Sequence, residues 1–206
     1  DGCGERESGG LSHLGIAITR KCEELGIILD ASHLSERGFW DLMSQTKAMV
    51  VATHSNAYAL CNHPRNLKDD QITAVAARGG LIGINFFPSF VKKDRPSIED
   101  VLDHIDYMVR MAGEDHVALG PDYQDFANEA VVPLLLKADP TGSMYPDGYA
   151  YPEGVETVAK EQNVVTGMRR RGYSEERIRK ICYENWLRVL AHHEPVRTEA
   201  LARHFA

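Results

Sequence analysis

Apolar positions along the chain alternate between two patterns. In the first, apolar residues recur three and four positions apart, which is the spacing of one helix face. In the second, a few consecutive apolar residues form a short run, as in a strand buried on both sides of a sheet. The first pattern predicts helices at about 11–25, 35–46, 69–78, 98–111, 154–171 and 174–191, and the second predicts strands at 27–31, 49–53, 81–86 and 116–120.

Several helix ends carry residues that start or stop a helix. Gly26 follows the first helical stretch and is a plausible stop. Ser35 precedes the second and can accept a hydrogen bond from its free backbone N–H groups. Ser97 and Asp100 resemble a capping box, with aspartate in place of the usual glutamate or glutamine. These residues support the predicted boundaries.

Strands that alternate with helices predict parallel βαβ units and an α/β fold. Two architectures remain open: a small doubly wound sheet, or half of a (β/α)8 barrel, which normally needs about 250 residues. We expect one domain at 1–192, with a long loop at 121–152 that contains a possible short helix near 131–138. Residues 193–206 are expected to be a tail, either a frayed helix or an added sequence.

Composition narrows the functional classes. The chain has 206 residues, of which 43% are hydrophobic and 26% charged, as in an ordinary globular protein. A net charge of -7 argues against a nucleic-acid-binding surface. We find no run long enough to cross a bilayer, and the compartment stays unknown, with cytoplasm and periplasm both open. The four cysteines form no C-x-x-C pair, which argues against a cysteine zinc site.

Each predicted strand runs directly into a polar residue. His33, His54, Asn85 and Asp122 follow the four strands in turn. In barrel enzymes the carboxyl ends of the strands build the active site, so these side chains are expected to meet at one rim. Histidine and aspartate without cysteine are typical of a hydrolytic zinc site. Taken singly, each could instead be a loop residue, a turn residue or a cap.

The order and spacing of many short segments resemble a known family over nearly the whole chain, up to about residue 192. The matching segments are DGC at 1–3, GLSHLG at 10–15, LGIILDASH at 25–33, THSNA at 53–57, HPRNL at 63–67, GGLIGINF at 79–86, DHIDY at 103–107, VALGPDY at 117–123, RGYS at 171–174 and ENWLRV at 184–189. Together they resemble the C-terminal half of the renal (membrane) dipeptidase family.

That resemblance implies a (β/α)8 barrel that hydrolyses dipeptides with two zinc ions per complete site. His33 and His54 match the two histidine ligands of one zinc. Asp122 matches the catalytic aspartate, which binds the other zinc and shuttles a proton. Arg65 matches the arginine that holds the terminal carboxylate of the substrate, a role suited to a bidentate guanidinium. Phe90 stands where some relatives place a tyrosine near the substrate.

The family's remaining metal ligands, a His-x-Asp pair and a bridging glutamate, belong to its N-terminal half, and this sequence has no His-x-Asp near its start. We therefore expect them to come from sequence outside these residues, in an N-terminal fragment or a companion chain, and we expect a homo-oligomer. Two alternatives stay open. The chain could be a non-catalytic family member that acts as an interaction module, or an amidohydrolase of another amide or lactam.

Overall fold

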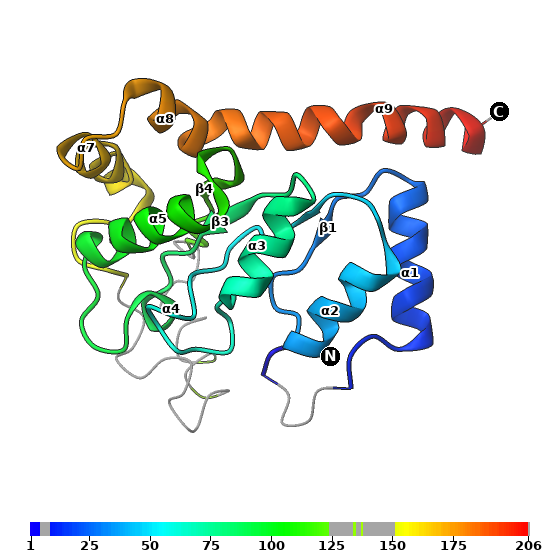
Figure 1. Ribbon diagram of the computed structural model, residues 1–206, viewed down its shortest axis with the longest axis horizontal. Coiled ribbons are helices and arrows are strands. Elements are labelled where there is room, and N and C mark those ends of the chain that lie inside the picture. Colours follow the sequence, from blue (N-terminus) through cyan, green and yellow to red (C-terminus); the bar gives the residue numbers. More distant parts are fainter. Residues whose placement is uncertain (5–8, 124–133, 135–136, 138–150, 206) are drawn as a thin grey trace.

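The computed structural model describes residues 1–4, 9–123, 134, 137 and 151–205. Four short parallel strands lie side by side in chain order: β1 (Leu29–Asp30), β2 (Val50–Val51), β3 (Ile82–Ile84) and β4 (Val117–Leu119). β1 pairs with β2, β3 pairs with β4, and a parallel bridge from Ala52 to Ile82 joins the two pairs. Each lies inside a predicted strand, and each is shorter than predicted. The α/β fold is confirmed (Figure 1).

The helices up to β4 begin close to the predicted positions, and two of them begin at the predicted caps, Ser35 and Ser97. They are α1 (His13–Glu24), α2 (Glu36–Gln45), α3 (Asp69–Ala77) and α5 (Ile98–Ala112), with two shorter elements, α4 (Pro88–Val91) and η1 (Glu114–His116). Ser35 accepts a hydrogen bond from the Gly38 backbone N–H at 3.0 Å. The Asp100 carboxylate accepts one from the Ser97 backbone N–H at 2.8 Å, which confirms the predicted capping box. The helix α4 was not predicted from the sequence.

The C-terminal helices differ from the prediction. They are η2 (Val158–Lys160), α7 (Gln162–Arg170), α8 (Glu175–Arg179), the π-helical turn η3 (Lys180–Glu184) and α9 (Asn185–Phe205). α7 begins eight positions later than the predicted start at 154. Residues 193–205, which were expected to belong to a tail, are helical, because α9 continues through Pro195.

Both faces of the strands are covered. On one face, Leu29, Val50 and Ile82 belong to a core that includes Phe39 of α2 and Ile105 of α5. On the other, Val51, Leu81 and Ala118 pack with Val189 of α9. Burial on both faces explains why the strands read as continuous apolar runs rather than as an alternating pattern.

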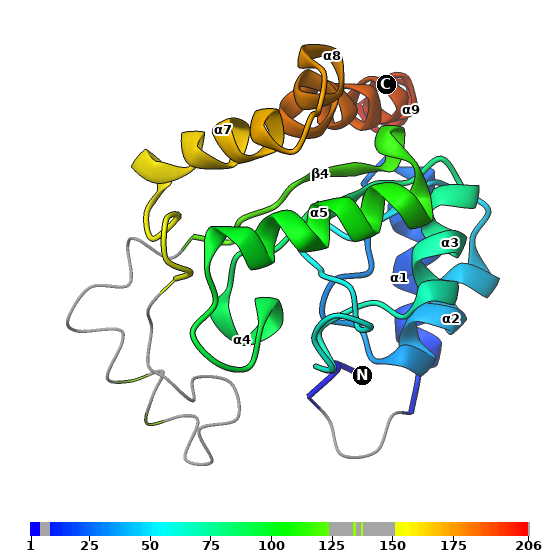
Figure 2. The same ribbon diagram turned by 60° about the vertical axis from the view of Figure 1, so that its left-hand side comes forward.

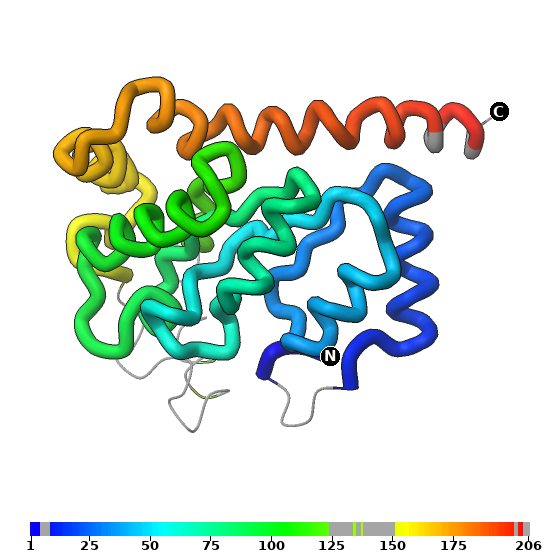
Figure 3. Tube along the Cα trace, in the orientation of Figure 1, coloured from blue at the N-terminus to red at the C-terminus, as the bar shows by residue number. Residues whose placement is uncertain are grey.

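α9 runs along one side of the molecule from α8 to the turn after α1, as Figures 1 and 2 show. Gly26 in that turn has a φ of +68°, and a Cβ there would lie 2.6 Å from the backbone nitrogen of Arg197. Only glycine permits this approach without displacing one of the two segments. The chain trace in Figure 3 shows α9 unbroken past this contact.

Among the described residues, no helix combines the length and the apolar character needed to cross a bilayer. Most of the predicted loop at 121–152, and with it the possible helix near 131–138, lies outside the described residues.

Candidate functional site

The ends of three strands approach one another closely where the candidate site begins. The Thr53 carbonyl oxygen, just after β2, lies only 2.0 Å from where a Cβ would stand at either Gly83 or Gly120. Two glycines therefore let the end of β2 pack against both β3 and β4. This packing fixes the position of His54, the next residue.

His33 and His54 point their imidazoles at each other. Their Nε2 atoms lie 2.9 Å apart, and the ring centroids 4.9 Å apart. His33 has a φ of 71°, a left-handed conformation that is uncommon for a residue with a side chain. Backbone held in this way at a functional residue is frequent, because the surrounding structure sets the direction of the side chain.

A hydrogen-bond chain fixes His54 from behind. Its Nδ1 lies 2.6 Å from the Thr53 hydroxyl, which lies 2.5 Å from the Asp30 carboxylate. The carboxylate can only accept, so Thr53 donates to Asp30 and accepts from the protonated Nδ1 of His54. The Nε2 of His54 then carries the free lone pair that a metal needs. Buttressing of this kind is the usual arrangement behind a metal-binding histidine.

Asp30, Thr53 and Ser32 were not among the site residues predicted from the sequence. The Ser32 hydroxyl accepts a hydrogen bond from the His54 backbone N–H at 3.1 Å. The one available indication was in the sequence itself, where Asp30 is a charged residue that directly follows the apolar run 27–29.

Asp122 lies in the same region but does not contact the histidines directly. Its carboxylate accepts a hydrogen bond from the Asn85 amide at 3.3 Å, and that amide also lies 3.5 Å from the His54 carbonyl oxygen. Asp122 has a φ of 60°, and its own carbonyl oxygen accepts a hydrogen bond from the Tyr151 hydroxyl. Asn85 thus links the aspartate to the histidine pair.

Arg65 reaches the histidine pair from the loop between β2 and α3. One of its terminal nitrogens, Nη2, lies 3.3 Å from the His33 Nε2 and donates to the His54 carbonyl oxygen at 3.3 Å. The guanidinium also stacks over the Phe90 ring, 5.2 Å from its centroid. Arg65 is only 4% exposed, yet within the described part of the chain its Nε has no hydrogen-bond partner, and the Asp122 and Asp30 carboxylates act on the guanidinium from beyond ion-pairing distance.

The charges around the site favour neutral imidazoles. Desolvation, followed by the nearby Arg65 guanidinium, lowers the pKa of His33 below its ordinary value. Desolvation also lowers the pKa of His54, with Asp122 opposing it. Burial lowers the pKa of Arg65, although an arginine stays protonated in a protein. Neutral imidazole is the form that binds a metal ion.

The residues present suit part of a zinc site. The two Nε2 atoms are close enough for a single ion, whose bonds to nitrogen are about 2.0–2.1 Å long, to reach both. Where the structure describes the chain, however, no three His, Cys, Asp or Glu side chains gather as a complete metal site. The structure therefore brings His33, His54 and Arg65 together, and connects Asp122 to them only through Asn85.

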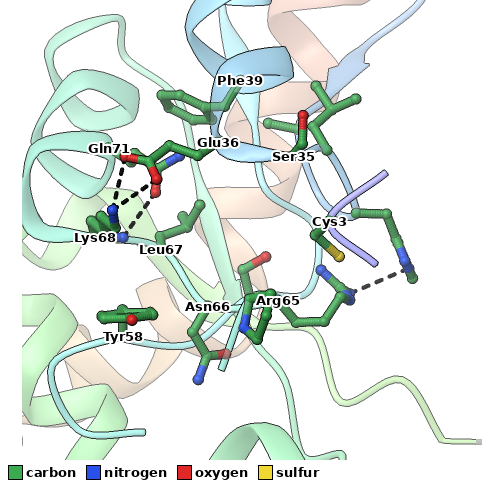
Figure 4. A pocket seen from close by; sticks show the side chains of 15 residues that line it. Cys3, Ser35, Glu36, Phe39, Tyr58, Arg65, Asn66, Leu67, Lys68 and Gln71 are labelled. Carbon is green, nitrogen blue, oxygen red and sulfur yellow. Dashed lines mark hydrogen bonds and ion pairs between the residues drawn. The ribbon is translucent and has the colours of Figure 1, made fainter. Parts of the chain in front are cut away.

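A cavity of about 260 Å³ opens beside Arg65 and His33. Figure 4 shows Arg65 and Cys3 on one side of it, and Lys68, Glu36 and Gln71 on the other. Three of its lining residues carry buried polar atoms without a partner in the described chain: Ser55 Oγ, Arg65 Nε and Asn66 Oδ1. Buried polar atoms normally have a partner, so these three atoms suggest that the cavity receives a polar group or ordered water.

Comparison with known proteins gives consistent matches. The profile of the family "Membrane dipeptidase (Peptidase family M19)" matches residues 1–135 and 141–204. An uncharacterized protein in the pqqA 5'region of Klebsiella pneumoniae is 35% identical over 186 residues, which are 88% of this chain and 60% of that protein. An uncharacterized dipeptidase of Schizosaccharomyces pombe is 38% identical over 141 residues, which are 67% of this chain and 32% of that protein.

A solved structure matches as well. The metallo peptidase from Rhodobacter sphaeroides, liganded with a phosphinate mimic of the dipeptide L-Ala-D-Ala, is 34% identical with a TM-score of 0.73. The match covers 88% of this chain and 47% of that one. The chain thus spans about half the length of this solved relative, and between a third and three fifths of the two curated ones.

Proposed function

The chain belongs to the membrane dipeptidase family, peptidase family M19, and we propose that it supplies the histidine ligands, the catalytic aspartate and the substrate-binding arginine of a zinc dipeptidase. Members of this family are metallopeptidases that hydrolyse dipeptides, so the chain is a peptide hydrolase by descent. The finer points, zinc itself and the role of each residue, rest on the contacts described above.

The observation that carries the proposal is the state of Arg65. A guanidinium that is 4% exposed and has no direct ion pair in the described chain is costly, because removing a charge from water needs compensation and the Asp122 and Asp30 carboxylates act only from a distance. Its position 3.3 Å from His33 would put a bound anion next to the metal ligands. A free substrate carboxylate supplies the missing anion and lets Arg65 align the scissile bond.

Each side chain then has a definite task. His33 and His54 hold one zinc, and the Asp30–Thr53 chain keeps the His54 Nε2 unprotonated and aimed. Asp122 would serve the second zinc and move a proton from water to the leaving amine. Asn85 holds the Asp122 carboxylate in place for that transfer. Bound zinc supplies an activated water and polarises the peptide carbonyl.

We also propose that the four strands are half of a (β/α)8 barrel. Their order follows the chain, which is the order of a barrel and not the reversed order at the centre of a doubly wound sheet. The rest of the barrel and the remaining metal ligands would come from an N-terminal fragment, a companion chain or a second copy. β1 and β4 each pair with only one strand among the described residues, so each has a free edge to offer.

The test has two parts, zinc binding and carboxylate recognition. Zinc content per chain should fall when His33 or His54 is replaced by alanine. Preparations that contain any co-purifying fragment should hydrolyse L-Ala-D-Ala, but hydrolyse its C-terminal amide at least a hundredfold less efficiently. Arg65→Met should remove this preference for the acid.

Arg110→Met is the matched control, because Arg110 also stacks on an aromatic ring, Tyr107 at 4.8 Å, but is exposed. Arg110→Met should change neither the zinc content nor the preference for the acid over the amide. Zinc uptake that ignores both histidines, or equal turnover of acid and amide, would overturn the proposal. A stable fold that takes up no zinc and cleaves nothing would instead support the non-catalytic alternative.

A further inference from the structure

We propose that the cavity beside Arg65 receives the side chain of the substrate's C-terminal residue, and that it favours large apolar side chains there. The inference rests on the proposed role of Arg65 as the carboxylate-binding residue. It adds a specificity pocket made by α2 and by the loop between β2 and α3. Its lining includes Leu34, Phe39, Tyr58 and Leu67.

The hydrogen-bonding atoms of Arg65 that have no partner indicate where a substrate carboxylate would bind relative to the cavity. Nη2 already contacts the His54 carbonyl oxygen and the His33 imidazole, whereas the buried Nε has no partner in the described chain. Arg65 Nε and Ser55 Oγ both belong to residues that line the cavity. A carboxylate bound by Nε, with Ser55 as a second donor, would lie at this cavity. The side chain on the adjacent carbon is then within reach of it.

The backbone nitrogen of the substrate's C-terminal residue also has a candidate partner at the cavity, the side chain of Asn66. The Asn66 amide nitrogen donates to the carbonyl oxygens of Cys61 and Phe90, both at 2.8 Å, so the amide is fixed in orientation. Its Oδ1 is buried and unpartnered, and it can only accept. The peptide N–H of a C-terminal residue is a donor of the kind that this atom lacks.

The walls decide which side chain fits. Phe39 is buried, and Leu34, Leu67 and Tyr58 add apolar surface. The charged groups at the far side, Lys68 and Glu36, are paired at 2.7 Å and offer no unpaired charge. A volume of about 260 Å³ is large enough for an aromatic ring. Burial of apolar surface is worth about 25 cal/mol per Å², so a phenylalanine gains over an alanine in such a pocket.

The experiment measures binding to the chain without zinc, so it does not depend on hydrolysis. N-acetylphenylalanine, N-acetylalanine and N-acetylphenylalanine amide are titrated by NMR. We expect N-acetylphenylalanine to bind at least fivefold more tightly than N-acetylalanine, and the amide to bind at least tenfold more weakly than its acid. Leu34→Trp, which fills the cavity, should abolish the advantage of phenylalanine, so that the two acids bind equally.

Leu60→Trp is the control, because Leu60 is 45% exposed and lies outside the cavity. Leu34→Phe is a smaller filling change for use if Leu34→Trp lowers the melting temperature. Two results would contradict the specificity pocket without affecting the proposed function: equal binding of the two acids, or tighter binding of N-acetylphenylalanine that persists in both Leu34→Trp and Leu34→Phe. Equal binding of acid and amide overturns the role of Arg65, and with it the proposed function.

Discussion

Asp30 reaches His54 through a single hydroxyl group. The Thr53 oxygen lies 2.5 Å from the carboxylate and 2.6 Å from the imidazole Nδ1, so one side chain connects the end of β1 to the residue that follows β2. Asp30 also accepts from the Ser32 backbone N–H at 2.9 Å and from the Thr53 backbone N–H at 3.0 Å. The carboxylate thus organises both strand ends as well as the imidazole.

Thr53→Val should weaken zinc binding without unfolding the chain. Valine has nearly the same shape but cannot pass the hydrogen bond from His54 to Asp30. Loss of such an outer hydrogen bond typically costs 10- to 100-fold in metal affinity, and we expect a decrease of about that size in competition with a chromogenic chelator. Thr73→Val is the control, because Thr73 is exposed on α3 and its hydroxyl, as far as the chain is described, bonds to the Asp69 carbonyl oxygen of its own helix. Unchanged affinity would remove Asp30 and Thr53 from the site.

Asp122→Asn should separate chemistry from folding. Asparagine tolerates the left-handed φ of 60° at this position about as well as aspartate does, so the backbone should persist. It cannot act as a base and is a poor zinc ligand, so dipeptide hydrolysis should fall by about a thousandfold or more. Circular dichroism and initial rates measure the two effects. Near-normal hydrolysis would contradict the assignment. Asp122→Ala, strained at this φ, should also lower stability.

His63 should make the chain less stable in mild acid. Burial, and then the Arg65 charge, lower the pKa of His63 from its ordinary value of 6.5 to about 4, and its Nδ1 accepts a hydrogen bond from the Arg65 backbone N–H. The folded state therefore binds this proton less readily than the unfolded state. The contribution of His63 is complete above pH 6.5 and is lost as the pH falls towards 4.

The size of this effect can be bounded. A shift of this size corresponds to about 3 kcal/mol for a fully desolvated imidazole, and we expect roughly half of that for a half-buried one. Urea unfolding at pH 7 and pH 4.5 should give a smaller difference in His63→Gln than in the parent chain. His13→Gln on the exposed face of α1 is the control. An equal pH dependence in parent and His63→Gln would show that His63 does not resist protonation.

Much of this fold could be predicted because its causes are local. The caps at Ser35 and Ser97 and the apolar runs of the strands depend on residues close together in sequence, and they appear as expected. The pairing of His33 with His54 also depends on the strand order, which the alternation of helix and strand left open between two architectures. The resemblance to a known family added Arg65, whose importance no local pattern indicates.

The rest depends on contacts between distant residues. The bonding of Thr53 to Asp30 requires the register of β1 against β2, which hydrophobic periodicity does not fix. The stacking of Arg65 on Phe90 joins two separate loops. The last helix was expected to end near residue 191, and Pro195 lies just beyond, where a proline inside a helix costs about 3 kcal/mol or more. α9 nevertheless continues, with its later part packed on the turn after α1.

Gly26→Ala should therefore be more damaging than an ordinary glycine substitution. Two costs combine at Gly26: its φ of +68° is left-handed, and a Cβ would lie 2.6 Å from the Arg197 nitrogen and 3.0 Å from its Cα, both backbone atoms of α9. Gly172 offers a matched control, because its φ is +84° but a Cβ there would meet nothing within 4 Å. Gly172→Ala should cost about 1–2 kcal/mol in the free energy of unfolding, from the backbone conformation alone. Gly26→Ala should cost about 1–3 kcal/mol more, as expected for an overpacked contact, and should increase hydrogen exchange in α9 beyond Pro195. Equal costs for the two substitutions would mean that α9 does not rest on this turn in solution.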